Sequence, residues 1–118
     1  MNGLPKDINL NPLIGAELLQ VCVGRFQYIL NFDLDISIST ECRCWFITEQ
    51  GEKLVISDNV ENASIVCSLI NHSVTYAGID SYGGLLLKFS NHATLHILND
   101  TENYEAFQLN IKGSLYVA

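Results

Sequence analysis

The strongest constraint on the fold is a strict alternation of apolar and polar residues over residues 26–46, FQYILNFDLDISISTECRCWF. Successive side chains of a β-strand point to opposite faces, so this period of two predicts a β-hairpin that turns near Asp33. A register slip of one residue would expose every apolar group, and the register is therefore strongly specified. The predicted inner face carries Phe26, Tyr28, Leu30, Phe32, Leu34, Ile36, Ile38, Thr40, Cys42, Cys44 and Phe46, and the opposite face carries Asp35, Ser37, Ser39, Glu41 and Arg43.

The pattern of this region recurs later in the chain. The stretch LIGAELLQVCVGRFQYILNFDLDISI aligns with LINHSVTYAGIDSYGGLLLKFSNHATLHI, with length changes confined to turns. The aligned pairs are Leu13 with Leu69, Ile14 with Ile70, Leu18 with Val74, Val21 with Ala77, Val23 with Ile79, Leu30 with Leu87, Phe32 with Phe89, Ile36 with Leu95 and Ile38 with Ile97. This result has two possible origins: a true duplication, or two amphipathic meanders that look alike through patterning alone. Either origin predicts two similar three-stranded meanders over residues 13–47 and 72–98.

One helix is predicted between the meanders, over residues 58–70. Apolar residues recur there at spacings of three and four, a stripe suited to packing on a sheet. Asp58 and Glu61 resemble a capping box at its start, and Asn71 is suited to its end. A short strand is expected at residues 54–56, and residues 104–117 predict C-terminal strands interrupted at Gly113.

These elements predict a mainly β protein, with α+β as the alternative class. We expect an antiparallel sheet that forms a sandwich or a partly closed barrel, and the alternation does not decide between the two. Residues 1–12 contain Gly, Pro and Asn and predict an irregular arm before a single domain at 13–118. An apolar content of 48% with only 16% charged residues excludes a disordered chain.

The charge balance restricts the partners. Thirteen acidic residues against six basic ones give a net charge of −7, which disfavours direct binding to nucleic acid or to anionic membranes and favours a basic partner. The first residues lack the pattern of a signal peptide, and no apolar run approaches the roughly 18 residues of a spanning helix. We therefore expect a cytoplasmic protein.

The cysteines and histidines predict no metal site, no cofactor and no catalytic centre. The cysteines are expected to be free thiols in a reducing compartment, because each lies within an apolar pattern. His92 and His96 would lie about 13 Å apart on an extended strand, too far for one ion. No serine or cysteine has a recognisable base partner in the sequence, so we expect a protein that is not an enzyme. The four cysteines are Cys22, Cys42, Cys44 and Cys67.

A partner-binding surface is predicted at acidic loops and two aromatic residues. Trp45 shares the polar face of its strand with Arg43 and Glu41, so it is either an interface anchor or part of a second small core. Tyr104, between acidic neighbours, is the first candidate for a buried anchor. The acidic candidates are Glu49, Glu52, Asp58, Glu61, Asp100, Glu102 and Glu105.

The stretch LIGAELLQVCVGRFQYILNFDLDISIS resembles the opening of small bacterial proteins of a poorly characterised family with relatives carried beside polymorphic toxins, and NDTENYEAFQLNIKG is similar too. The resemblance spans residues 13–113 and rests on structural patterns, so it carries over no active-site residue. It implies a cytoplasmic immunity protein that neutralises the toxin of a contact-dependent growth inhibition system. An acidic protein suits a basic RNase or tRNase domain as its target. A small-ligand-binding or regulatory β-domain is the alternative, and a self-assembling structural module is the third class.

Overall fold

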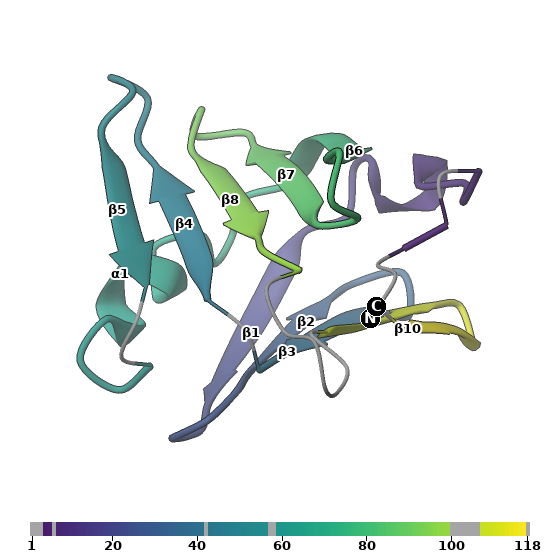
Figure 1. The fold of residues 1–118 in the computed structure, drawn as a ribbon, viewed down its shortest axis with the longest axis horizontal. Coiled ribbons are helices and arrows are strands. Elements are labelled where there is room, and N and C mark those ends of the chain that lie inside the picture. The colour runs from purple at the N-terminus through teal and green to yellow at the C-terminus, as the bar shows by residue number, and fades with distance from the viewer. Residues whose placement is uncertain (1–3, 6, 42, 57–58, 100–106, 118) are drawn as a thin grey trace.

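The chain forms two five-stranded antiparallel sheets that lie face to face as a sandwich (Figure 1). The computed structural model describes residues 4–5, 7–41, 43–56, 59–99 and 107–117. The first sheet has the order β1 (Leu18–Val23), β2 (Tyr28–Phe32), β3 (Ile36–Thr40), β9 (Phe107–Ile111) and β10 (Ser114–Val117). The second sheet has the order β5 (Lys53–Ile56), β4 (Cys44–Ile47), β8 (Thr94–Ile97), β7 (Leu85–Phe89) and β6 (Val74–Ile79). The sheets do not close into a barrel, so the expectation of a mainly β fold is confirmed in its sandwich form.

The core lies between the sheets and follows the alternation in the sequence. In β2, β3 and β9 every second residue is buried, and the residues between them are half-buried on the outer face. Phe32 and Phe89 stack across the core with ring centroids 6.4 Å apart. Burial of these side chains is the main favourable contribution to folding.

The two halves of the chain have the same topology and exchange their last hairpins. Strands β1–β3 form a meander in the first sheet, and the hairpin β4–β5 that follows crosses to the second sheet. Strands β6–β8 form a meander in the second sheet, and the hairpin β9–β10 crosses back to the first. Each sheet therefore contains three strands of one half and two strands of the other, and both meanders carry a bulge at the same place, after Leu18 and after Val74.

The halves are joined by backbone pairing at equivalent residues. Glu17 and Ser73 form an isolated antiparallel bridge. The N–H of Leu18 donates to the carbonyl of His72, and the N–H of Val74 donates to that of Ala16. Gly15 and Asn71 occupy equivalent positions with positive φ angles of 88° and 74°, and each donates across the bridge, to Val74 and Leu18 respectively. Glycine and asparagine are the residues that tolerate this conformation best.

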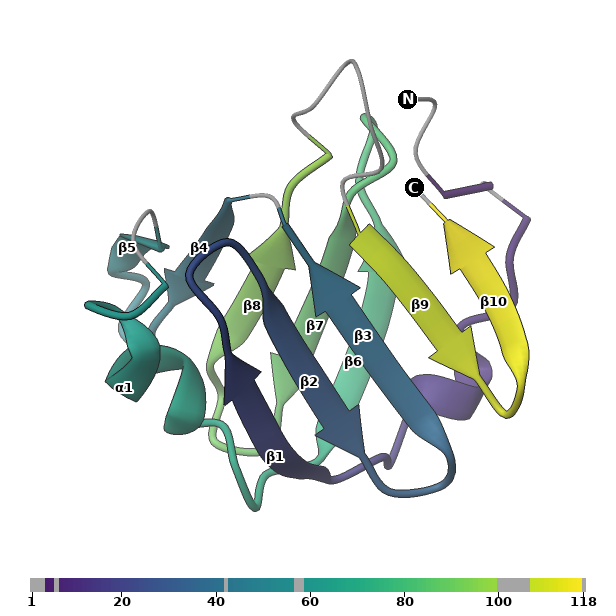
Figure 2. The ribbon, with the colours of Figure 1, turned by 90° about the horizontal axis from the view of Figure 1, so that it is seen from below.

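Two short helices occupy equivalent positions beside the first strands. The 3₁₀ helix η1 (Asn11–Leu13) contacts β6, and α1 (Ala63–Cys67) contacts β1, as Figure 2 shows for α1. The predicted helix over 58–70 is thus confirmed as an element but is shorter at both ends, since residues 59–62 and 68–70 form turns. Asn59 uses its polar groups in tertiary bonds instead: its carbonyl accepts from the Tyr28 hydroxyl, and its side chain donates to the Gly24 carbonyl.

The opening hairpin differs from the prediction beyond its first turn. The predicted second strand is two strands, β3 and β4, which lie in different sheets. Phe26 and Leu34 were predicted to face the core, but both lie in turns and are largely exposed. The repeat alignment holds through Phe32 and Phe89 and then shifts by two residues, because the registers make Ile38 the equivalent of Leu95.

The N-terminal arm packs on the sandwich. Leu4 and Leu10 are buried, and the N–H of Leu4 donates to the carbonyl of Gly83 in the β6–β7 turn. Within the described part of the chain, the structure contains no helix with the length and apolar character needed to cross a membrane.

Candidate functional site

The exchange of hairpins gives the two sheets equivalent outer faces, and the side chains on them differ. On the second sheet, cross-strand partners form one row from β5 to β6. We call it the Trp45 row: Val55, Trp45, His96, Leu86 and Gly78. The equivalent row of the first sheet is Val117, Gln108, Ser39, Ile29 and Cys22.

The neighbouring rows differ in the same way. On the second sheet this row is Lys53, Ile47, Thr94, Lys88 and Tyr76, and on the first sheet it is Leu115, Asn110, Ser37, Asn31 and Gln20. The backbone is the same on both faces, so the fold does not require an aromatic or charged residue at these positions. The fold therefore does not explain why the outer face of the second sheet carries aromatic and basic side chains.

Trp45 makes two of the ring contacts on this face. It is half-buried on β4, its ring meets the ring of His96 edge-on at a centroid distance of 5.5 Å, and Lys53 Nζ lies 3.7 Å from the ring centroid. The prediction left open whether Trp45 is exposed or belongs to a second small core. The structure places it on an outer face, where it contacts neighbouring side chains and retains exposed surface.

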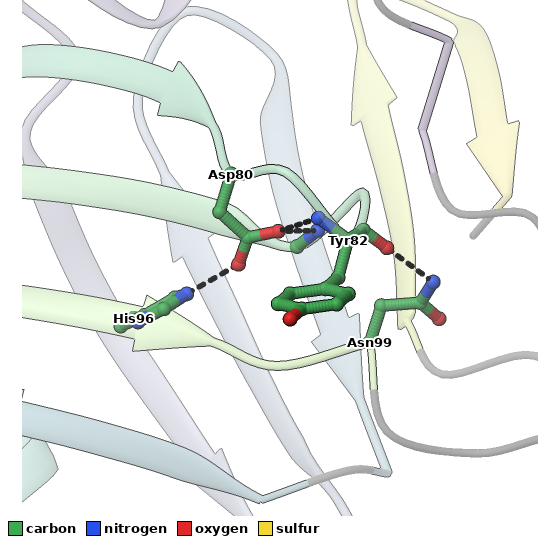
Figure 3. Close-up of polar contacts among 5 residues, drawn as sticks. Asp80, Tyr82, His96 and Asn99 are labelled. Atoms are coloured by element: carbon green, nitrogen blue, oxygen red, sulfur yellow. Dashed lines mark hydrogen bonds and ion pairs between the residues drawn. The ribbon is translucent and has the colours of Figure 1, made fainter.

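Asp80 connects the end of β6 to His96 on β8. Its Oδ1 accepts hydrogen bonds from the N–H groups of Tyr82 and Gly84, both at 2.8 Å, and its Oδ2 lies 2.5 Å from His96 Nε2 (Figure 3). The side chain of Asn99 donates to the Tyr82 carbonyl at 2.8 Å. These bonds fix the β6–β7 turn, and Figure 3 shows the Tyr82 ring beside the Asp80–His96 pair.

The site lies in a partly desolvated environment. The side chains of His96 and Asp80 are only 15% and 16% exposed. Burial raises the pKa of Asp80, but hydrogen bonds from His96, Gly84 and Tyr82, together with the charge of a protonated His96, outweigh it and lower this pKa below its ordinary value of 3.8. Asp80 is therefore a stable anion at neutral pH.

Gly84 is required by the close approach of this carboxylate. A Cβ atom on Gly84 would lie 2.5 Å from Asp80 Oδ2 and 2.7 Å from the carbonyl oxygen of Ile97. The second contact is with the backbone of a central strand, which cannot move easily. The glycine thus permits Asp80 to reach His96.

A pocket of about 300 Å³ lies at this end of the second sheet. It is lined by Trp45, Asp80, Tyr82, His96, Leu98 and Asn99, and we call it the Trp45 pocket. Tyr82 is 80% exposed, so its ring forms the outer wall. A second hollow of about 510 Å³ shares Asp80 and lies between β6 and the N-terminal residues 8–11.

Two histidines of the described residues have side-chain polar contacts. His96 contacts Asp80 through Nε2, and within the described ranges no Ser, Thr or Cys side chain is hydrogen-bonded to it. His72 Nδ1 lies 3.3 Å from Ser90 Oγ, but that hydroxyl also accepts from the N–H of Ser73. In the first half of the chain, Asp33 occupies the position equivalent to Ser90, and its carboxylate accepts from the N–H of Glu17, the counterpart of Ser73. The role of Ser90 is therefore structural.

The predicted acidic surface is divided. Glu49 and Glu52 are exposed in the β4–β5 turn, and Glu61 is exposed just before α1. Because β5 lies between these two places, the three carboxylates do not form one cluster (Figure 1). Asp58, Asp100, Glu102, Tyr104 and Glu105 lie outside the described residues.

Among the described residues, Cys22 and Cys67 are free thiols. Cys44 is buried, and Cys22 and Cys67 are half-buried; Cys42 lies outside the described residues. Across the part of the chain that the structure describes, no three His, Cys, Asp or Glu side chains form a group suited to a metal ion. The expectation of four free thiols stays a prediction.

Sequence reasoning missed the Asp80–His96 pair. The sequence pattern relates His96 only to His92, as a possible ligand pair, and predicts no partner for Asp80. A signal was available in the repeat, because the alignment sets Asp80 opposite Gly24 and His96 opposite a serine, which is Ser37 in the alignment and Ser39 by the registers of the strands. Two coordinated departures from a repeated pattern indicate an added interaction.

The fold defines this protein as an antiparallel β-sandwich of two topologically equivalent halves, whose second sheet carries an aromatic pocket with a half-buried Asp–His pair. The chain belongs to the family described as "Family of unknown function (DUF6188)", whose model matches residues 10–118. Neither a curated protein nor a solved structure matches it.

Proposed function

We propose that this protein is an immunity protein, which binds and neutralises the toxin domain of a contact-dependent growth inhibition system in the cytoplasm of its own cell. The observation that carries the proposal is the outer face of the second sheet. There Trp45, Val55 and Tyr76 are partly exposed, with Tyr82 at the rim. Partly exposed aromatic residues in a defined surface are the usual anchors of protein interfaces.

Charge and sequence resemblance support a basic target. The net charge of −7 favours association with a basic domain such as an RNase or tRNase. Exposed Glu49 and Glu52 lie in the turn that joins β4 to β5, directly after the Ile47–Lys53 pair, so the row of this pair lies between them and the Trp45 row. In this arrangement the acidic turn accelerates association, and Trp45 provides the lifetime of the complex.

The test is coexpression with the toxin domain encoded in the neighbouring reading frame. Wild type should restore growth, and Trp45→Ala should weaken protection and increase the dissociation rate. Gln108→Ala is the matched control, because Gln108 occupies the equivalent position of the first sheet. A folded Trp45→Ala variant that protects like wild type would place the interface elsewhere, and a wild-type protein that neither binds nor protects would contradict the immunity function.

Charge is tested separately with Glu49→Lys/Glu52→Lys. The double variant should associate more slowly than wild type, with a weaker dependence of the association rate on salt, and its dissociation rate should change little. Stopped-flow binding at several ionic strengths measures all three quantities. An unchanged association rate would remove this turn from the interface.

A small-ligand-binding domain is the second candidate, and the Trp45 pocket is the observation that favours it. A pocket of about 300 Å³ lies at the lower end of the range for small-ligand sites. Native mass spectrometry of the purified protein discriminates the two, since a stoichiometric copurified small molecule would favour the ligand-binding function.

A further inference from the structure

The Trp45 pocket combines three rings with one carboxylate. Trp45, Tyr82 and His96 supply the rings, and Asp80 supplies the negative charge. A cation over the face of an aromatic ring is attracted by its quadrupole, and the attraction grows when the site is partly desolvated. Lys53 already makes this contact with Trp45 at 3.7 Å, which shows that a face of the ring accepts a cation in this structure.

The carboxylate has capacity for one more donor. Asp80 Oδ1 accepts from two N–H groups, whereas Oδ2 is paired with His96 alone among the residues that the structure describes. A carboxylate oxygen can accept two hydrogen bonds. When His96 is neutral, Asp80 is the one charged group in the lining, and an added cation would compensate it.

The shape and polarity of the pocket favour a guanidinium group over an ammonium group. Guanidinium is planar, stacks on aromatic rings and is more weakly hydrated than ammonium, so its transfer into a site walled by rings and Leu98 costs less. Lys53 lies in the neighbouring row and does not line the pocket, so its own charge does not occupy this space.

We infer that the Trp45 pocket receives an arginine side chain of the partner protein, stacked against Trp45 and Tyr82 and hydrogen-bonded to Asp80. This inference rests on the proposed function for the identity of the protein partner. The net charge of −7 would attract such a basic partner at long range, and the pocket would select the position of one arginine.

The single tryptophan of the chain makes the inference directly measurable. Trp45 is the only source of tryptophan fluorescence, and it lines the pocket. The probes are the amides of N-acetylarginine, N-acetyllysine and N-acetylcitrulline, titrated at constant ionic strength. Citrulline is the uncharged counterpart of arginine with nearly the same shape, and free N-acetyltryptophanamide corrects for collisional quenching.

The arginine amide should change Trp45 fluorescence with saturation, and the citrulline amide should not. Tyr82→Ala should weaken binding of the arginine amide by about threefold or more, in line with the loss of one cation–π contact. Tyr82 is 80% exposed, so this substitution leaves the core intact. Phe26→Ala is the matched control, because Phe26 is the exposed aromatic residue of the equivalent β1–β2 turn, and it should bind like wild type.

Four results would overturn the inference. Equal binding of the citrulline amide would show that charge is not recognised, equal binding of the lysine amide would remove the preference for guanidinium, and an unsaturable response or an unaffected Tyr82→Ala variant would show that the pocket is not the site. The toxin test is independent of these. If Tyr82→Ala protects the cell as well as wild type, the immunity function stands but does not use the pocket. If wild type binds the arginine amide with saturation but does not protect the cell, the pocket binds arginine and the immunity function is wrong.

Discussion

Asp80 shows how a single substitution changes a repeated scaffold. The equivalent residue in the first half, Gly24, has no side chain and closes its turn through one backbone bond to Gln27. Asp80 keeps the equivalent backbone bond to Gly84 and adds side-chain bonds to Tyr82, Gly84 and His96. Its carboxylate therefore connects the turn to the adjacent strand, which the glycine cannot do.

Replacing Asp80 by asparagine should destabilise the protein in a pH-dependent way. The lowered pKa of Asp80 means that the ionised form is favoured by folding, so its contribution is fully present above the unfolded value of 3.8 and is lost as the pH falls through the lower folded value. At pH 7, Asp80→Asn should reduce the free energy of unfolding by roughly 1–3 kcal/mol, as expected for hydrogen bonds to a charged group. Urea denaturation between pH 7 and pH 3, followed by circular dichroism, measures the difference from wild type.

The control for this experiment is Asp35→Asn. Asp35 is exposed in the β2–β3 turn with a φ angle of 59°, a conformation that asparagine also tolerates, so its free energy of unfolding should stay close to that of wild type. A difference between wild type and Asp80→Asn that is as large at pH 3 as at pH 7 would show that the carboxylate charge does not stabilise the fold.

The candidate site was only partly predictable at the residue scale. Trp45 could be identified because a tryptophan among charged residues interrupts a polar face. The pairing of Asp80 with His96 could not be read from local pattern, because it depends on which strand lies beside the β6–β7 turn. Only the register of β7 with β8 brings the two residues together.

At the scale of single elements, β3 is the clearest case of sequence determining structure. Ile36, Ile38 and Thr40 face the core, and Ser37 and Ser39 lie half-buried on the outer face. The strand lies between β2 and β9, so both its edges are paired. Alternation alone therefore predicted the orientation of each of its side chains.

Neighbouring residues of β3 should respond in opposite ways to the same substitution. Ile38 is fully buried, so Ile38→Asp places an unpaired charge in the core and should cost about 3–5 kcal/mol or prevent folding. Ser37 faces outward between Asn31 and Asn110, and Ser37→Asp should cost about 1 kcal/mol or less. Thermal unfolding followed by circular dichroism separates the two variants, and similar melting temperatures would contradict the assignment of faces.

The boundary between β3 and β4 could not be predicted in the same way. The period of two continues from Ile38 to Phe46 without interruption, so the sequence suggested one long strand. The chain leaves the first sheet after Thr40 and enters the second at Cys44. In both sheets every second side chain of this segment faces the shared core. The change of sheet therefore does not interrupt the alternation of apolar and polar residues.

For the whole molecule, the exchanged hairpins make the two halves depend on each other. The meander β1–β3 obtains its fourth and fifth strands from β9 and β10, and the meander β6–β8 obtains them from β4 and β5. A half alone would leave the inner face of its meander uncovered, and its hairpin would lack a strand to pair with. A sequence repeat cannot reveal this exchange, because a half that folds on itself and a half that exchanges its hairpin have the same pattern.

Dividing the chain between Val60 and Glu61 should therefore give two fragments that do not fold as monomers. Fragment 1–60 retains β1–β5 and fragment 61–118 retains α1 and β6–β10, and the cut lies at exposed residues outside every strand. Mixed in equal amounts, the fragments should form a one-to-one complex with the circular dichroism spectrum of the intact protein and a cooperative thermal transition. Size-exclusion chromatography with light scattering gives the stoichiometry.

Because the halves are equivalent, two copies of one fragment could also pair, so the decisive quantity is the number of chains in the folded species. A folded monomer of either fragment would show that each half can keep its own hairpin and that the exchange is not required for stability.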